Sequence, residues 1–311
     1  MRHFLFTLVL YFTAIPYLWA DILTPPQQVS KHVYAWIGPY GGPSVENKGY
    51  RMNLAFVVGT KAVAVLDSGY YPAMAKEMVA HINAITPLPI KYVINTNSQP
   101  HRFLGNDVFR SLGAQTITSA GEAARMETNA NNYAMALEMV MKFKPEDIVL
   151  PQPPSRVLAK NTQIDLGGGV ILDLHIHKAA HTPAPIVVHI PVDNIVYASD
   201  VLYSGRLLAV IDGGNVKQWI DMYQYLEQFG GVTFIPGHGE PGPLSDFHQS
   251  TLVYLEKLYA HMTKMVDEGV DMQDAIKQFD QSAFSKLANF DLLAGRNAQR
   301  AYQEAEQASF E

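Results

Sequence analysis

Three residues with metal-binding or acid–base side chains follow short apolar segments in the second half of the chain. They are His181 in an Ala-His-Thr run, Asp200 in Ala-Ser-Asp, and His238 in Pro-Gly-His-Gly. Strand ends and the loops after them are places where a rigid scaffold holds ligand-binding groups in fixed positions. Two imidazoles and one carboxylate suit zinc or another borderline metal ion. We therefore expect these three side chains to share one cleft.

These segments resemble the motifs of the metallo-β-lactamase superfamily. Residues 181–183, Asp200 and residues 236–239 resemble the family's third-ligand, bridging-aspartate and last-histidine motifs in order and spacing. Residues 53–58, 66–69 and 93–96 resemble its opening strands. The resemblance implies a four-layer αββα sandwich of the α/β (α+β) class, a metal site and hydrolysis by a metal-bound water. Residues 297–304 are similar to the exported, SoxH-like branch associated with quinoprotein systems.

The first ligand motif of that family is altered in this chain. Where the family has His-x-His-x-Asp-His before Gly-Asn, residues 97–102 are NSQPHR, and Gly-Asn follows at 105–106. Asn97 and Gln99 thus replace the two histidines of the first metal, His101 replaces the aspartate, and Arg102 replaces the histidine of the second. Carboxamides are poor ligands for such metals, and arginine neither binds metal nor loses its proton. A binuclear centre is therefore not expected.

Two functions remain open after this substitution. In the first, one zinc ion is held by a set of four ligands, namely His101, His181, Asp200 and His238. Its bound water would hydrolyse an ester or thioester-like bond of a small molecule, with Asp200, His101 and Arg102 as catalytic groups. In the second, Arg102 pairs with Asp200 and replaces the charge of the metal, and the protein is a metal-free ligand-binding protein or a pseudoenzyme. A bidentate contact between Arg102 and Asp200 would favour the second.

Five more residues are candidates for binding substrate or supporting this site. Asn97 and Gln99 are expected to cap the backbone at a strand end. Asp67 is expected to hold the loop after its strand by hydrogen bonds rather than to bind metal directly. Tyr203 and Arg206, just beyond Asp200, could reach a substrate anion, and packing is the alternative role for Tyr203.

A second group of polar residues lies on one predicted strand, residues 170–176. Asp173, His175 and His177 alternate with apolar residues and therefore share one face, because successive side chains of a strand point to opposite sides. We interpret this face as a solvated rim. The preceding triple glycine, residues 167–169, lacks the Lys-Ser/Thr of a phosphate-binding loop, so it predicts a hairpin turn.

Composition excludes several classes of function. The chain has 311 residues, of which 48% are hydrophobic and 17% charged, and its formal net charge is −6. The absence of a basic cluster argues against a nucleic-acid partner. The chain has no cysteine, which excludes thiolate chemistry and suits an oxidising compartment. A small-molecule substrate or ligand is expected, and a protein partner is left open.

The first twenty residues are typical of a secretory signal peptide. Arg2 and His3 precede an apolar run that ends at Leu18, and Ala20 stands before the expected cleavage site. We expect a periplasmic or secreted protein with no membrane contact after cleavage. The large Leu18 keeps an uncleaved membrane anchor as the alternative, although the run is short for a spanning helix.

The remaining sequence, residues 21–311, is expected to form one domain with C-terminal helices. Period-two apolar patterns and short apolar runs predict strands at 31–37, 53–58, 62–67, 90–95, 162–166, 170–176, 186–190, 194–198 and 232–235. Helical spacing predicts helices at 70–85, within 120–144, from 215 to about 230, and from 249 almost to 311. Strand and helix blocks in tandem predict sheets inside and helices outside.

Overall fold

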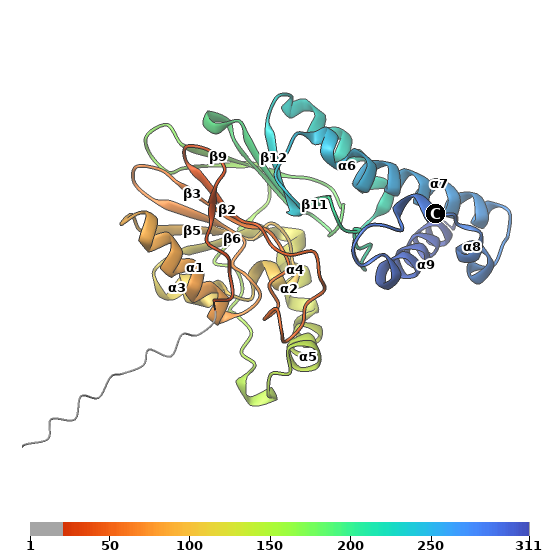
Figure 1. Cartoon of the computed structure of the whole chain (residues 1–311), viewed down its shortest axis with the longest axis horizontal. Helices are drawn as coiled ribbons and strands as arrows, with labels where there is room; N and C mark the ends of the chain where they lie inside the picture. Colours follow the sequence, from red (N-terminus) through yellow and green to blue (C-terminus); the bar gives the residue numbers. More distant parts are fainter. Residues whose placement is uncertain (1–20, 311) are drawn as a thin grey trace, which may run out of the picture.

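The computed structural model describes residues 21–310, so the expected signal peptide lies outside the described part of the chain. Within that part, two sheets pack face to face and helices cover their outer sides (Figure 1). The strand orders are β1-β2-β3-β4-β5-β6-β7 and β12-β11-β10-β9-β8. This arrangement confirms the predicted αββα sandwich.

The first sheet combines an antiparallel and a parallel half. Its strands are β1 (Gln27–Gln28), β2 (Val33–Trp36), β3 (Leu54–Val58), β4 (Val63–Leu66), β5 (Ile90–Ile94), β6 (Gln115–Ser119) and β7 (Arg156–Leu158). Strands β1 to β4 pair antiparallel, and β4 to β7 pair parallel. Every residue of β4, sequence VAVL, is buried, as expected for a strand covered on both faces. Strands β1, β6 and β7 were not predicted, because they are short or carry few apolar residues.

The second sheet is antiparallel except at one edge. Its strands are β8 (Thr162–Asp165), β9 (Ile171–Ile176), β10 (Ile186–Ile190), β11 (Ile195–Tyr203) and β12 (Thr233–His238), with β11 and β12 parallel. The triple glycine between β8 and β9 is a turn with φ values of 84°, 69° and 82°, a left-handed region that favours glycine. The predicted hairpin is thus confirmed.

Helices form the outer layers and a C-terminal extension. They are α1 (Pro72–Ile85), α2 (Pro100–Phe103), α3 (Asn106–Ser111), α4 (Ala120–Thr128), α5 (Ala130–Met141), α6 (Val216–Leu226), α7 (Tyr254–Asp267), α8 (Met272–Gln278) and α9 (Phe290–Ala308). Short 3₁₀ turns lie at 145–147, 191–193, 227–229, 244–247 and 282–284, and a π-helical turn lies at 248–253. None of the helices in residues 21–310 is long and apolar enough to cross a membrane.

The region from residue 249 is largely helical, as predicted, but it is divided into three helices. Gly269, with a φ of 69°, follows the end of α7, and the Asp271 side chain caps the start of α8 by accepting from the backbone N–H groups of Gln273 and Asp274. The three helices α7, α8 and α9 lie together at one end of the molecule (Figure 1). The Asn215 cap of α6 was predicted correctly, since its side chain accepts from the N–H of Gln218.

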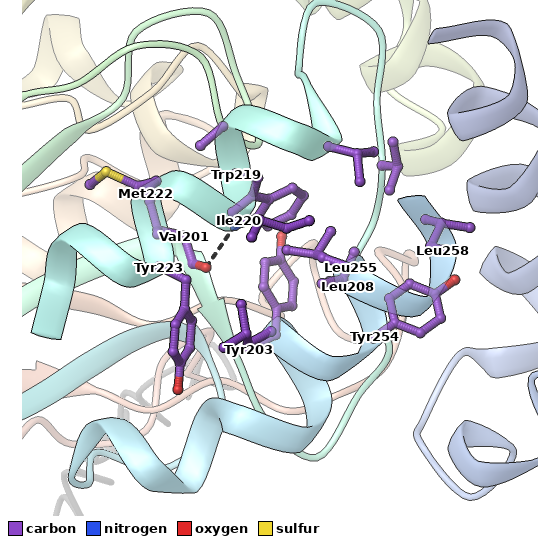
Figure 2. Close-up of a cluster of buried hydrophobic side chains, with 14 of the residues drawn as sticks. Val201, Tyr203, Leu208, Trp219, Ile220, Met222, Tyr223, Tyr254, Leu255 and Leu258 are labelled. Atoms are coloured by element: carbon purple, nitrogen blue, oxygen red, sulfur yellow. Dashed lines mark hydrogen bonds between the residues drawn. The ribbon is translucent and has the colours of Figure 1, made fainter. Parts of the chain in front are cut away.

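Apolar side chains fill the spaces between the layers. One cluster lies between the sheets, and a second lies between the second sheet and helices α6, α7 and α9. Figure 2 shows part of the second cluster, where Tyr203 of β11 and Trp219 of α6 pack together and the indole N–H of Trp219 donates to the Val201 carbonyl at 2.9 Å. This contact fixes the end of β11, from which the candidate site is built.

A pair of glycine substitutions tests the close packing at Gly105, where the segment between α2 and α3 approaches the segment that follows β4. A Cβ at Gly105 would overlap the carbonyl oxygen of Ser68, whereas a Cβ at Gly295 in α9 would meet nothing within 4 Å. We expect Gly105→Ala to lower the free energy of unfolding by about 1–3 kcal/mol through overpacking. We expect Gly295→Ala to raise it by about 0.4–1 kcal/mol, because alanine suits a helix interior better. Urea denaturation measures both, and equal effects of the two substitutions would contradict the packing described here.

Candidate functional site

The candidate site lies where the second sheet meets the segment that follows β5 of the first. His101 and Arg102 lie in α2, His238 is the last residue of β12, and Asp200 lies in β11. The strand predicted at 194–198, before Asp200, extends further, and β11 continues through Asp200 to Tyr203. Its pairing with β12 is irregular around Ser199, a residue with a φ of 50°. Such irregularities redirect a side chain without ending a strand.

A bidentate ion pair between Arg102 and Asp200 occupies the centre of this site. Nε of Arg102 donates to Oδ2 of Asp200 at 2.9 Å, and Nη2 donates to Oδ1 at 2.5 Å. Both side chains are almost completely buried. Gly237 lies against the pair, and a Cβ there would overlap both Oδ1 of Asp200 and Nη2 of Arg102. Glycine at this position therefore allows the ion pair to pack against β12.

The third nitrogen of Arg102 is also fully used. Nη1 donates to the Asn53 carbonyl at 2.6 Å, to the Tyr197 hydroxyl at 3.2 Å and to Oδ2 of Asp67 at 3.2 Å. Burial alone would lower the pKa of this guanidinium, but Asp200, Tyr197 and Asp67 raise it above its usual value. Arg102 thus carries a fixed positive charge in the interior.

Asp67 supports Arg102 from a strained backbone position. Its φ is 65°, and its carboxylate accepts hydrogen bonds from Thr96 N–H at 2.7 Å, from the Tyr197 hydroxyl at 2.9 Å and from the Ser199 hydroxyl at 3.2 Å. Burial raises the pKa of Asp67, while Arg102, Thr96 and Tyr197 oppose the rise. Asp67 therefore lies behind the guanidinium, as a partner of Arg102.

Two histidines lie beside Asp200, one next to each carboxylate oxygen. Nε2 of His101 lies 3.4 Å from Oδ2, and Nε2 of His238 lies 3.4 Å from Oδ1. The ligand atoms of these three residues lie within 4.8 Å of one another, so by distance alone the group could hold a metal ion. Burial lowers the pKa of His101 well below its usual value and that of His238 to about 3, so both rings are neutral at pH 7.

His181 does not join this group. Its Nε2 lies 3.1 Å from Nε2 of Gln99, and its ring packs against Trp219. Burial lowers its pKa to about 4, and the positive charge of Arg102 acts in the same direction. His181 reaches Asp200 only indirectly, because the N–H of Gln99 donates to Oδ1 of Asn97 at 2.9 Å and Nδ2 of Asn97 donates to Asp200 at 3.0 Å.

Arg206 and Tyr203 lie beside His238. Nη1 of Arg206 lies 3.4 Å from Nδ1 of His238, and the Tyr203 ring stacks on the His238 ring at 5.0 Å. Both residues are buried. Burial lowers the pKa of Arg206 to about 10, helped by the positive charge of Arg51, and the group remains charged at pH 7.

Sequence reasoning missed two residues of this site, Arg51 and Glu122. Nη2 of Arg51 lies 3.2 Å from Nδ1 of His101, and its carbonyl oxygen lies 2.7 Å from Nδ1 of His238. The buried Glu122 accepts from the N–H and hydroxyl of Ser98 and from the N–H of Ala184, which joins the altered motif to the His181 loop. Neither residue belongs to a recognisable motif, and only their place in the fold reveals them.

The hydrogen bonds of this group do not fit a divalent metal ion. A guanidinium only donates, so Nδ1 of His101 accepts from Arg51 and the proton of the neutral ring is on Nε2. A metal between the three residues would need the lone pair of that same Nε2. Both oxygens of Asp200 already accept from Arg102. Nδ1 of His238 lies 2.7 Å from the Arg51 carbonyl, which only accepts, and this contact is shorter than the 3.4 Å to Nη1 of Arg206. The ring proton of His238 is therefore on Nδ1, and only its Nε2 keeps a lone pair on the side of Asp200.

Solved structures share this fold at low sequence identity. The metallo-beta-lactamase from Pontibacter korlensis matches with a TM-score of 0.61 and 18% identity, over 74% of this chain and 98% of that chain. VMB-1 matches with a TM-score of 0.59 and 18% identity, over 74% of this chain and 96% of that chain. TMB-1 matches with a TM-score of 0.58 and 16% identity, over 75% of this chain and 96% of that chain.

The family model described as the metallo-beta-lactamase superfamily matches residues 49–238, a segment that contains Arg51, the altered motif and His238. It does not assign a branch, and the SoxH-like resemblance stays a prediction. Because the match covers more than half of the chain, the protein belongs to the metallo-β-lactamase superfamily.

Proposed function

We propose that this protein binds a small anionic ligand at the site around Asp200, without a metal ion. The observation that carries the proposal is the bidentate ion pair between Arg102 and Asp200. In this pair the guanidinium supplies the positive charge that a metal would otherwise place beside the aspartate. The ligand-binding alternative of the sequence analysis is therefore the one that the geometry favours.

The charges of the site support an anion rather than a second cation. Three guanidinium groups lie around Asp200: Arg102 pairs with Asp200 and Asp67, while Arg51 and Arg206 contact the flanking His101 and His238. The third carboxylate of the site, Glu122, accepts hydrogen bonds from Ser98 and Ala184 instead. The groups immediately around Asp200 thus have a positive excess even when Asp67 and Asp200 are both ionised. A divalent ion would add two more positive charges at low dielectric, whereas an anion would offset the excess.

Arg51 is the group best placed to meet a ligand. It is partly exposed, while Asp200, His101 and His238 are buried behind it. Its Nε is buried and has no hydrogen-bond partner among residues 21–310. Buried donors without a partner are rare, and a carboxylate or phosphate oxygen would satisfy this one with a charge-assisted hydrogen bond. We infer that the ligand carries such a group and enters past Arg51.

A mononuclear metal hydrolase is the second candidate. The mutual distances of His101, Asp200 and His238 and the free Nε2 of His238 favour it. In that case a bound zinc ion would activate water, and Arg102 would have to release at least one oxygen of Asp200. For either function we propose action after export, because residues 1–20 are typical of a signal peptide.

The metal content of two variants separates these functions. We expect His238→Ala to contain the same amount of zinc as the wild type, because no ion depends on His238. We expect the fourfold variant Asn97→His, Gln99→His, His101→Asp and Arg102→His, which restores the family motif, to gain zinc. Mass spectrometry of dialysed protein measures both. Loss of one equivalent of zinc in His238→Ala, relative to the wild type, would contradict the metal-free site.

The affinity for anions tests the role of Arg51. We expect carboxylates or phosphate to raise the melting temperature of the wild type, and Arg51→Gln to weaken their binding about 10- to 100-fold through loss of a charge-assisted hydrogen bond. Arg300→Gln is the matched control, since the Arg300 side chain is 39% exposed and pairs with Asp212 on the surface. Equal effects of both substitutions would show a non-specific salt effect and contradict the proposal.

Stability should fall in mild acid because the buried histidines are neutral in the folded protein. The pKa values of His181 and His238 fall from 6.5 to about 4 and about 3, so the unfolded chain binds their protons first. Their contribution to the free energy of unfolding is complete above pH 6.5. It decreases as the pH falls towards 4, by roughly 1.4 kcal/mol per pH unit for each histidine. Urea denaturation at several pH values measures how steeply the free energy of unfolding depends on pH. His238→Gln should reduce it, and an unchanged slope would contradict this assignment.

A further inference from the structure

A second group of potential metal ligands lies on the second sheet, apart from the candidate site. Asp173 and His175 are two residues apart on β9 and therefore point to the same face. His189 on β10 pairs directly opposite Asp173 in the antiparallel register. Their neighbours Leu172 and Leu174 point the other way, into the core between the sheets. The three polar side chains thus share the outer face of the sheet, on the side of α6.

The distances within this group suit a shared ion. One ligand atom from each of the three residues lies within 4.8 Å of the other two. Nδ1 of His189 lies 3.8 Å from Oδ2 of Asp173. Two ligands of one tetrahedral zinc ion lie about 3.3 Å apart when each is about 2.0–2.1 Å from the metal. Small rotations of the side chains would therefore bring all three donors to one ion.

Neighbouring groups leave the required atoms free. Nε2 of Gln163 donates to Oδ1 of Asp173 at 2.7 Å, which leaves Oδ2 available. The Tyr225 hydroxyl lies 3.0 Å from Nδ1 of His175, while Nε2 of His175 is buried and has no hydrogen-bond partner among residues 21–310. In metal sites, the second nitrogen of a ligating histidine is commonly held by such a hydrogen bond.

The surroundings close one side of the group and leave another open. The Phe229 ring contacts the rings of His175 and His189, with centroids 5.2 and 4.9 Å apart. The His189 and Asp173 side chains remain 19% and 22% exposed. An ion could therefore enter from solvent and keep at least one position for water.

We propose that Asp173, His175 and His189 form a binding site for one divalent transition-metal ion, with zinc as the reference ion. Two imidazoles and one carboxylate match zinc, cobalt, nickel or copper, whereas magnesium and calcium prefer all-oxygen sites. No basic side chain takes part in the contacts described for this group, in contrast to the guanidinium-rich candidate site. The polar strand face that the sequence analysis interpreted as a solvated rim thus acquires a specific role.

Zinc and cobalt titrations of the purified protein test this proposal. After treatment with chelator, the wild type should bind about one zinc ion, and cobalt should give the visible absorption bands of a low-coordinate site. His175→Gln, His189→Gln and Asp173→Asn should each lose the ion and the bands. His248→Gln, which changes an exposed histidine elsewhere, should keep both.

Two further variants make the outcome specific. Tyr225→Phe should weaken zinc binding about 10- to 100-fold without abolishing it, because it removes the hydrogen bond to His175 but no ligand. His238→Ala should leave the zinc stoichiometry unchanged. Absence of zinc binding in the wild type, or retention of the ion in all three ligand variants, would overturn the proposal. Loss of the ion in His238→Ala alone would assign it to the candidate site, which would overturn both this inference and the proposed metal-free function.

Discussion

The buried ion pair between Arg102 and Asp200 is the interaction on which the candidate site depends. Its partners come from the two halves of the sandwich, since Arg102 follows β5 of the first sheet and Asp200 lies in β11 of the second. A buried charge is tolerated only when its partners satisfy it. Arg102 meets this requirement with hydrogen bonds from all three nitrogens. The pair therefore fixes how the two sheets meet at this end of the fold.

Several local features follow from that requirement. Glycine at position 237 leaves the space that the pair needs, and the left-handed backbone of Asp67 accompanies a carboxylate held behind the guanidinium. Asn53 contributes its carbonyl to Arg102, while its side-chain amide donates to the carbonyls of residues 236 and 239. Each of these groups satisfies a buried polar atom, and together they form a connected network whose members specify one arrangement.

The charge of the network also separates it from the second histidine group. Around Asp200, the guanidinium groups of Arg51, Arg102 and Arg206 outnumber the carboxylates of Asp67 and Asp200, a balance that favours anions. On the outer face of β9 and β10, Asp173 and two histidines meet with no arginine among the contacts described. The same residue types thus suit different ligands, because the neighbouring charges differ.

The sequence determined the fold class and most of the strands, because alternating and continuous apolar runs depend only on local spacing. It also placed the altered motif, since the flanking residues fixed its alignment, and it anticipated the pairing of Arg102 with Asp200 as one of two outcomes. It placed helices in the C-terminal region but not the break between α7 and α8, where a glycine and a capping aspartate interrupt the pattern.

Only the tertiary structure decided which side chains meet. Arg51 and Glu122 lie outside any motif and reach the site through contacts between segments distant in the chain. His181 was expected with His238 but lies against Gln99, because the loop after β9 directs it there. Hydrogen-bond partners and the resulting charge of a buried site depend on distances of a few ångströms between remote segments. Residue types and spacing do not contain those distances, so the sequence could name the candidates but could not choose between a metal and a guanidinium.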